Sequence, residues 1–101
     1  MTVVAFVKTV EYLDWYSLQA DKIKAQIDAR LLKIQEYSHY GFTRRLSSIL
    51  FELKFNNGNR IYCTEKTIDG KTMILILGGN KNGQDKDIKR AQKIAEKIHG
   101  N

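Results

Sequence analysis

Apolar side chains along this chain follow first a helical spacing, then a strand spacing, then a helical spacing again. Residues 3–7 are rich in β-branched side chains and predict a short strand, after which Thr9 can cap a helix that runs to about residue 18. A second helix is expected from Asp21, because apolar residues recur every three or four positions along one face. They are Ile23, Ile27, Leu31 and Ile34. Gly41 is expected to close this helical region.

The middle of the chain predicts an antiparallel meander of three strands. The expected strands are residues 49–55, 60–66 and 72–77. Residues 56–59 and 69–70 separate them and are rich in Asn, Asp and Gly, which tolerate the positive φ values of tight turns.

A polar loop at residues 80–83 leads to a last helix at about residues 85–99, where Asp85 is the expected cap and Gly100 the expected terminator. One side of this helix is apolar, with Ile88, Ala91, Ala95 and Ile98. The order β-α-α-β-β-β-α predicts an α+β domain over residues 1–101, with a curved, mostly antiparallel sheet and the helices packed on one of its faces.

Composition narrows the class of protein. The chain has 101 residues and a formal net charge of +6, concentrated in residues 21–60 and 81–101. This charge favours a polyanion or an acidic protein as partner, although a basic protein without an anionic partner would look the same. The chain has neither an apolar run of bilayer length nor a signal segment, so we expect a cytoplasmic protein without membrane contact. Cys63 is the only cysteine and is expected in the core.

Alternation along the meander separates two faces of the sheet. Phe51, Leu53 and Phe55 should share one face with Ile61 and Cys63 and meet the helices. The opposite face should expose four polar residues to solvent, as a plain solvated face or as a binding surface. They are Glu52, Lys54, Arg60 and Tyr62.

This set of side chains has the chemistry that RNA cleavage through the ribose 2′-hydroxyl needs. Arg60 can stabilise charge on the phosphate, and Lys54 can bind phosphate or transfer a proton. Glu52 is a candidate base, and Tyr62 can stack on a nucleobase or donate a proton. Lys81 follows the last strand and can reach the same surface. We expect no cofactor and no metal site, because His39 and His99 lack further ligands at metal spacing.

Three segments, at residues 50–54, 58–62 and 77–91, resemble motifs of the RelE/ParE toxin superfamily, in particular its HigB-like "addiction module killer" branch. The segments read Leu-Phe-Glu-Leu-Lys, Gly-Asn-Arg-Ile-Tyr and Leu-Gly-Gly-Asn-Lys-Asn-Gly-Gln-Asp-Lys-Asp-Ile-Lys-Arg-Ala, in the order typical of that branch. Trp15 and the sequence Ala-Arg-Leu at residues 29–31 also fit, so the resemblance covers almost the whole chain.

The resemblance implies a RelE-like fold and a toxin that is neutralised by a cognate antitoxin, here expected to be a helix-turn-helix protein. Operator DNA would be bound only indirectly, through that antitoxin. Many members of the superfamily cut messenger RNA on the ribosome without metal, with basic residues at positions that match Lys54 and Arg60, and roughly Lys81. Arg44 and Arg45 would then hold ribosomal RNA or the message, or else form a solvated basic loop.

The sequence departs from the pattern at Lys54, where the family usually has Arg, and at Asn80, where the branch often has Asp. These departures leave the general acid unassigned. The leading hypothesis is a metal-independent, ribosome-dependent mRNA endonuclease that inhibits translation. The alternatives are a ParE-like toxin that binds gyrase without nuclease activity, and a degenerate toxin that only binds its antitoxin.

Overall fold

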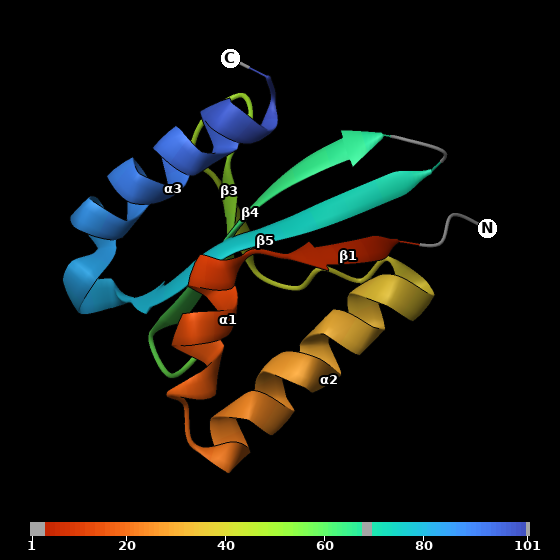
Figure 1. Cartoon of the computed structure of the whole chain (residues 1–101). Helices are drawn as coiled ribbons and strands as arrows, with labels where there is room; N and C mark the ends of the chain where they lie inside the picture. Colours follow the sequence, from red (N-terminus) through yellow and green to blue (C-terminus); the bar gives the residue numbers. More distant parts are fainter. Residues whose placement is uncertain (1–3, 68–69, 101) are drawn as a thin grey trace.

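The computed structural model describes residues 4–67 and 70–100 as a single five-stranded sheet with three α-helices (Figure 1). The strands are β1 (Ala5–Lys8), β2 (Thr43–Arg45), β3 (Phe51–Lys54), β4 (Asn59–Thr67) and β5 (Lys71–Asn80). The helices are α1 (Val10–Ser17), α2 (Asp21–Tyr37) and α3 (Gln84–Ile98), with a 3₁₀ turn at Lys81–Gly83. No helix in these two ranges is long and apolar enough to cross a bilayer.

The strands lie in the order β1-β5-β4-β3-β2, with β1 parallel to β5 and all other pairs antiparallel. This confirms the predicted α+β class and the three-stranded meander. The edge strand β2 was not predicted, since residues 43–45 are short, polar and exposed. Residue 3, the start of the first predicted strand, and residue 69 of the second turn lie outside the described residues.

Most predicted helix boundaries are confirmed, and each has a local cause. The hydroxyl of Thr9 accepts a hydrogen bond from the Tyr12 backbone N–H at 3.0 Å, which caps α1 as expected. Helix α2 begins at Asp21 but ends at Tyr37, because Ser38 adopts a left-handed conformation with φ 54° well before Gly41. Asp85 does not cap α3. Its N-cap is Gly83, and Asp85 lies in the first turn of the helix.

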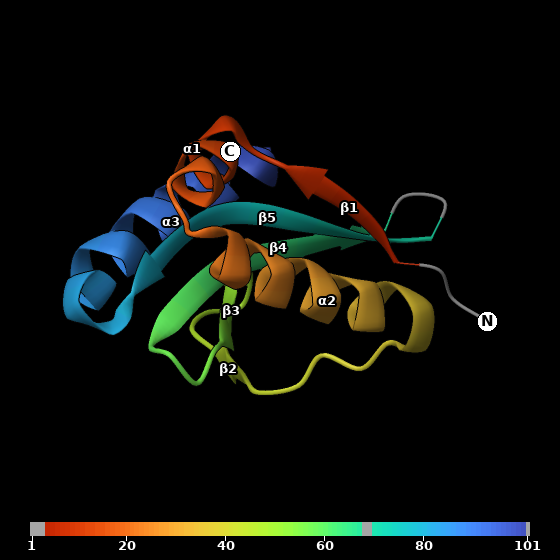
Figure 2. The same ribbon diagram turned by 90° about the horizontal axis from the view of Figure 1, so that it is seen from below.

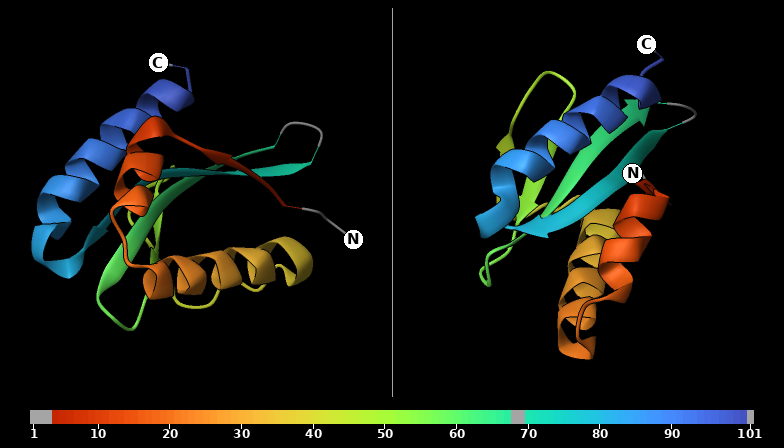
Figure 3. Two further views of the ribbon diagram at one scale, coloured as in Figure 1. Left: turned by 60° about the horizontal axis from the view of Figure 1, so that its bottom comes forward. Right: turned by 60° about the vertical axis from the view of Figure 1, so that its left-hand side comes forward.

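Helices cover both faces of the sheet, and this corrects the prediction that they pack on one face. Helices α1 and α2 bury Phe51, Leu53, Ile61 and Cys63 together with the apolar residues of β5 that share their face. Helix α3 packs on the opposite face, where Ala91 and Ala95 contact a second apolar cluster. Figure 2 shows α2 and α3 on opposite sides of the sheet, and the right-hand view of Figure 3 shows α1 beside α2.

Two adjacent glycines at the end of β5 let these two layers approach the sheet closely. A Cβ at Gly78 would lie 2.0 Å from the Trp15 ring of α1, and a Cβ at Gly79 would lie 2.1 Å from the Asp87 carboxylate of α3. A bulge between Tyr62 and Cys63 in the β4–β5 register precedes this pair of glycines. The glycines therefore serve close packing on opposite faces.

Replacing Gly78 with alanine should lower the free energy of unfolding by about 1–3 kcal/mol, because the new methyl group overlaps the Trp15 ring. Urea unfolding of the wild type and of Gly78→Ala measures this loss. In a Trp15→Ala background the same substitution should cost little, since the ring is gone. An equal loss in both backgrounds would contradict the proposed clash.

Candidate functional site

Three of the predicted site residues converge on one open hollow at the tip of the β3–β4 hairpin. Lys54 and Arg60 are cross-strand partners in the β3–β4 register, and Lys81 follows the end of β5. All three line a hollow of about 290 Å³. The remaining lining residues are Phe42, Phe55, Asn56, Asn57 and Gly58, so none of them is acidic. The structure therefore brings the predicted cations together.

The hairpin turn positions Lys81 at this hollow. Gly58 has φ 93°, a value that favours glycine, and its backbone N–H donates to the Phe55 carbonyl at 3.1 Å. The Lys81 N–H donates to the Gly58 carbonyl at 3.0 Å. A Cβ at Gly58 would lie 3.6 Å from Cδ of Lys81, so the lysine stem lies along the turn.

Sequence reasoning did not place two residues at this hollow. Phe42 lines it, and Arg30 fixes the segment that carries Phe42. The Arg30 guanidinium donates to the carbonyls of Tyr40 and Phe42, at 2.9 Å and 2.6 Å from Nη2, and also to that of Lys54. The guanidinium also stacks on the Phe55 ring, with Cζ of Arg30 4.6 Å from the ring centroid. Arg30 lies outside the apolar stripe of α2, and its motif Ala-Arg-Leu was the only signal that singled it out.

Phe42 is 72% exposed at the rim of the hollow, and Nζ of Lys54 lies 5.1 Å from the centroid of its ring. The Arg30 bonds hold this exposed ring beside the cations, although burial alone would draw a phenylalanine into the core.

Glu52 is fully buried, which corrects the prediction of an exposed candidate base. Its carboxylate lies 3.2 Å from Nε of Arg44 and 3.6 Å from Nε of Arg60, and the Gln84 amide donates to both of its oxygens at 3.3 Å. A buried carboxylate needs such compensation. In this arrangement Glu52 holds Arg60 in place, and its burial separates it from any substrate on the surface.

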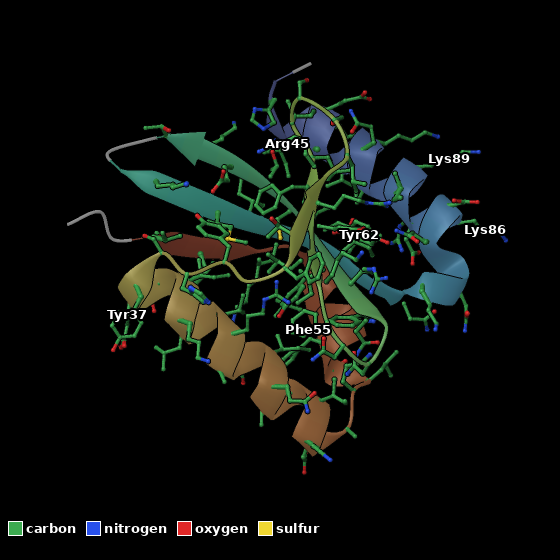
Figure 4. All side chains as sticks on the ribbon, turned by 180° about the vertical axis from the view of Figure 1, so that it is seen from behind. Tyr37, Arg45, Phe55, Tyr62, Lys86 and Lys89 are labelled. Carbon is green, nitrogen blue, oxygen red and sulfur yellow. The ribbon has the colours of Figure 1, made fainter. Side chains whose placement is uncertain are left out.

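Tyr62 is also fully buried, so it cannot stack on a nucleobase as predicted (Figure 4). It pairs with Glu52 across β3 and β4 and packs under α3. Among the described residues its hydroxyl has no hydrogen-bond partner. Burial, followed by the charges of Glu52 and Asp87, raises the pKa of Tyr62 to about 12, so the phenol keeps its proton at neutral pH.

Arg44 and Arg45 point to opposite faces of the edge strand β2. Arg44 pairs with buried Glu52 and is half exposed, whereas the Arg45 guanidinium lies 5.5 Å from the centroid of the Phe51 ring on the other face. The two residues therefore do not form the joint basic loop that their adjacency in the sequence suggested.

The hollow can bind and stabilise a phosphate but offers little acid–base chemistry of its own. An Arg and two Lys side chains supply three positive charges, and the Arg60 side chain is only 12% exposed, which limits its freedom. In residues 4–67 and 70–100, no three His, Cys, Asp or Glu side chains come together as metal ligands. Cys63 is buried and burial raises the pKa of its thiol well above the usual value, as expected for a core cysteine.

The chain is similar to known proteins in sequence and in structure. No known family model matches the chain. An uncharacterised protein of Haemophilus influenzae is 33% identical over 91 residues, which is 89% of this chain and 91% of that protein.

Two solved structures of the Escherichia coli toxin RelE are also similar. A mutant in the free state has a TM-score of 0.63 at 14% identity, and the isolated toxin has a TM-score of 0.57 at 17% identity. Each comparison covers 89% of this chain and 98% of the RelE chain. At this level of identity the likeness shows a shared fold.

Replacing Glu52 with glutamine should lower the free energy of unfolding by about 1.5–3 kcal/mol, because Arg44 and Arg60 lose their charged acceptor. Denaturant titration measures the loss. Glu65→Gln is the matched control, since that carboxylate is partly exposed and, among the described residues, pairs with Lys71 and Tyr40 alone. It should cost less than about 1 kcal/mol. Equal losses of unfolding free energy in the two variants would contradict this stabilising role of Glu52.

Proposed function

This chain belongs to the same family as the uncharacterised Haemophilus influenzae protein and has the RelE fold, and from that premise we propose that it is the toxin of a toxin–antitoxin pair. Its proposed activity is metal-independent cleavage of messenger RNA on the ribosome, in the cytoplasm, which inhibits translation. The observation that carries this proposal is the convergence of Lys54, Arg60 and Lys81 on one hollow without a carboxylate in its lining. Such a hollow attracts the RNA backbone.

The reaction that fits these residues is attack of the ribose 2′-oxygen on the neighbouring phosphorus. The 2′-hydroxyl loses a proton, the 5′-oxygen leaves and gains one, and negative charge grows on the phosphate oxygens between these events. Arg60 stabilises that charge, and Lys54 and Lys81 assist by binding the phosphate or donating a proton. Glu52 contributes indirectly, since it fixes the position of Arg60.

The proposed toxin function also implies the partners of the protein. A cognate antitoxin, expected to be a helix-turn-helix protein, would neutralise the toxin and connect it to operator DNA. The ribosome would supply the message in the correct geometry, and a positioned substrate lowers the demand on the protein's own acid and base. Arg44 and Arg45 would contact ribosomal RNA or message from the exposed edge strand β2.

A second candidate, a toxin that binds DNA gyrase without cutting RNA, is favoured by one observation. Glu52 and Tyr62, which the sequence offered as acid–base groups, are both fully buried. A shared fold is compatible with either activity, so the target must be measured directly.

Arg60→Ala should abolish growth arrest and lower the yield of RNA cuts by about 100-fold or more, because one donor to the developing phosphate charge is lost. Primer extension on a translated message, after brief induction of each variant, measures the cuts. Lys86→Ala is the matched control, since Lys86 is an exposed cation on the outer side of α3 (Figure 4).

Other outcomes of this induction experiment would each contradict part of the proposal. Wild-type cutting by a folded Arg60→Ala protein would remove Arg60 from the mechanism. Growth arrest by the wild type with intact message would replace the nuclease by the gyrase-binding toxin, and plasmid supercoiling would then be assayed. Normal growth during wild-type induction would reduce the protein to a degenerate toxin that only binds its antitoxin.

A further inference from the structure

A second hollow, of about 430 Å³, lies beside the first, between α2 and the segment that follows it. Helix α2 contributes Arg30 and Lys33 to its lining, and the following segment contributes His39 and Phe42. The other lining residues are Gln26, Ala29, Tyr40, Gly41, Lys54, Phe55 and Asn56. The catalytic steps proposed above take place in the first hollow.

The charge of this second hollow is wholly positive. Arg30, Lys33 and Lys54 line it, and no Asp or Glu does. An anion that enters therefore meets three cations without a neutralising carboxylate in the wall. Field lines of one sign are concentrated in such a concave site, which raises the local concentration of an anionic ligand.

The wall of the hollow is held in place before any ligand arrives. The Arg30 guanidinium is committed to the carbonyls of Tyr40, Phe42 and Lys54. Gly41 has φ 72°, and a Cβ at this position would lie 3.3 Å from Nη2 of Arg30, so the segment packs tightly against the guanidinium. A preformed wall reduces the ordering cost of binding.

Phe42 gives the hollow an aromatic surface. Phe42 is 72% exposed, and the Lys54 ammonium lies over its ring. An aromatic ring among cations is the combination that binds unpaired nucleic-acid strands, because bases stack on the ring while cations hold the backbone.

The two hollows are adjacent and share part of their walls. Both are lined by Phe42, Lys54, Phe55 and Asn56. A strand whose phosphate lies at Arg60 and Lys81 in the first hollow can therefore continue past Phe42 to Lys33 in the second.

We propose that the second hollow is a subsite for single-stranded RNA, in which a nucleotide neighbouring the cleaved phosphate stacks on Phe42 and places its own phosphate at Lys33. The inference rests on the proposed function, since it extends the substrate of the first hollow. Base-paired RNA is excluded from this subsite, because a base that stacks on a side chain must be free of its helix.

Binding of an unstructured uridine-rich RNA of about 12 nucleotides, followed by fluorescence anisotropy at low salt, tests this subsite. Phe42→Ala should weaken binding by about 5- to 150-fold, the range that corresponds to losing one base stack. Phe42→Trp should bind at least as well as the wild type. Lys33→Gln should reduce the slope of log K against log salt by about 0.7, as expected for one lost phosphate contact on a single strand.

Two control variants remove similar side chains elsewhere on the helix that lines the hollow. Tyr37→Ala removes a 74% exposed aromatic ring at the C-terminal end of α2 that does not line the hollow, and Lys22→Gln removes an exposed cation near the start of this helix. Both should bind the RNA as the wild type does. Unchanged binding by Phe42→Ala and Lys33→Gln, or equal losses in the two controls, would overturn the subsite.

Further arms distinguish the ligand and separate this inference from the nuclease proposal. Tighter binding of a duplex than of the single strand would overturn it, as would competition by uridine 5′-monophosphate or inorganic phosphate at the concentration of the strand itself. Losses in the Phe42 and Lys33 variants without any message cleavage by the wild type would support the subsite and contradict the nuclease. Cleavage with unchanged binding in these variants would do the reverse.

Discussion

A carboxylate buried in a sheet must be matched by donors and cations from its surroundings, and Glu52 imposes this requirement on four elements at once. It lies in β3, and its partners Arg44, Arg60 and Gln84 come from β2, β4 and the start of α3. Desolvation makes an isolated buried charge very costly, so these three partners together stabilise the fold. The same contact aims Arg60 at the hollow. The stability of this buried charge and the proposed phosphate binding therefore share one guanidinium.

The order of elements could be predicted because its causes are local. Helical spacing, the Thr9 cap and the glycine-containing turns lie within short segments, so the sequence alone reveals them. The covering of the second sheet face could not be predicted in the same way, because Glu52 and Tyr62 alternate as exposed residues would. Leu50 lies on that same face and α3 has an apolar side of its own. Together these were the available signs that α3 packs there.

The part of the candidate site that the sequence could predict depends on the register of the strands. Lys54 and Arg60 flank a four-residue turn, so pairing them required only the hairpin, and Lys81 follows a strand whose direction the meander dictates. The anchoring of Phe42 depends on Arg30, which reaches three backbone carbonyls distant along the chain. The motif that contains Arg30 does not predict its contacts with these distant carbonyls, so this part of the site becomes visible only in three dimensions.

The arginines and lysines at the two hollows differ in their contacts. Arg44 and Arg60 each place Nε beside the buried Glu52 carboxylate, and Arg30 donates to three backbone carbonyls, so these arginines also organise the structure around the hollows. Lys54, Lys81 and Lys33 line the hollows and form no ion pair among the described residues. The lysine at position 54 is consistent with this difference. A point charge on a flexible stem can adjust to the proposed phosphate, whereas the arginines also fix the surface beside it.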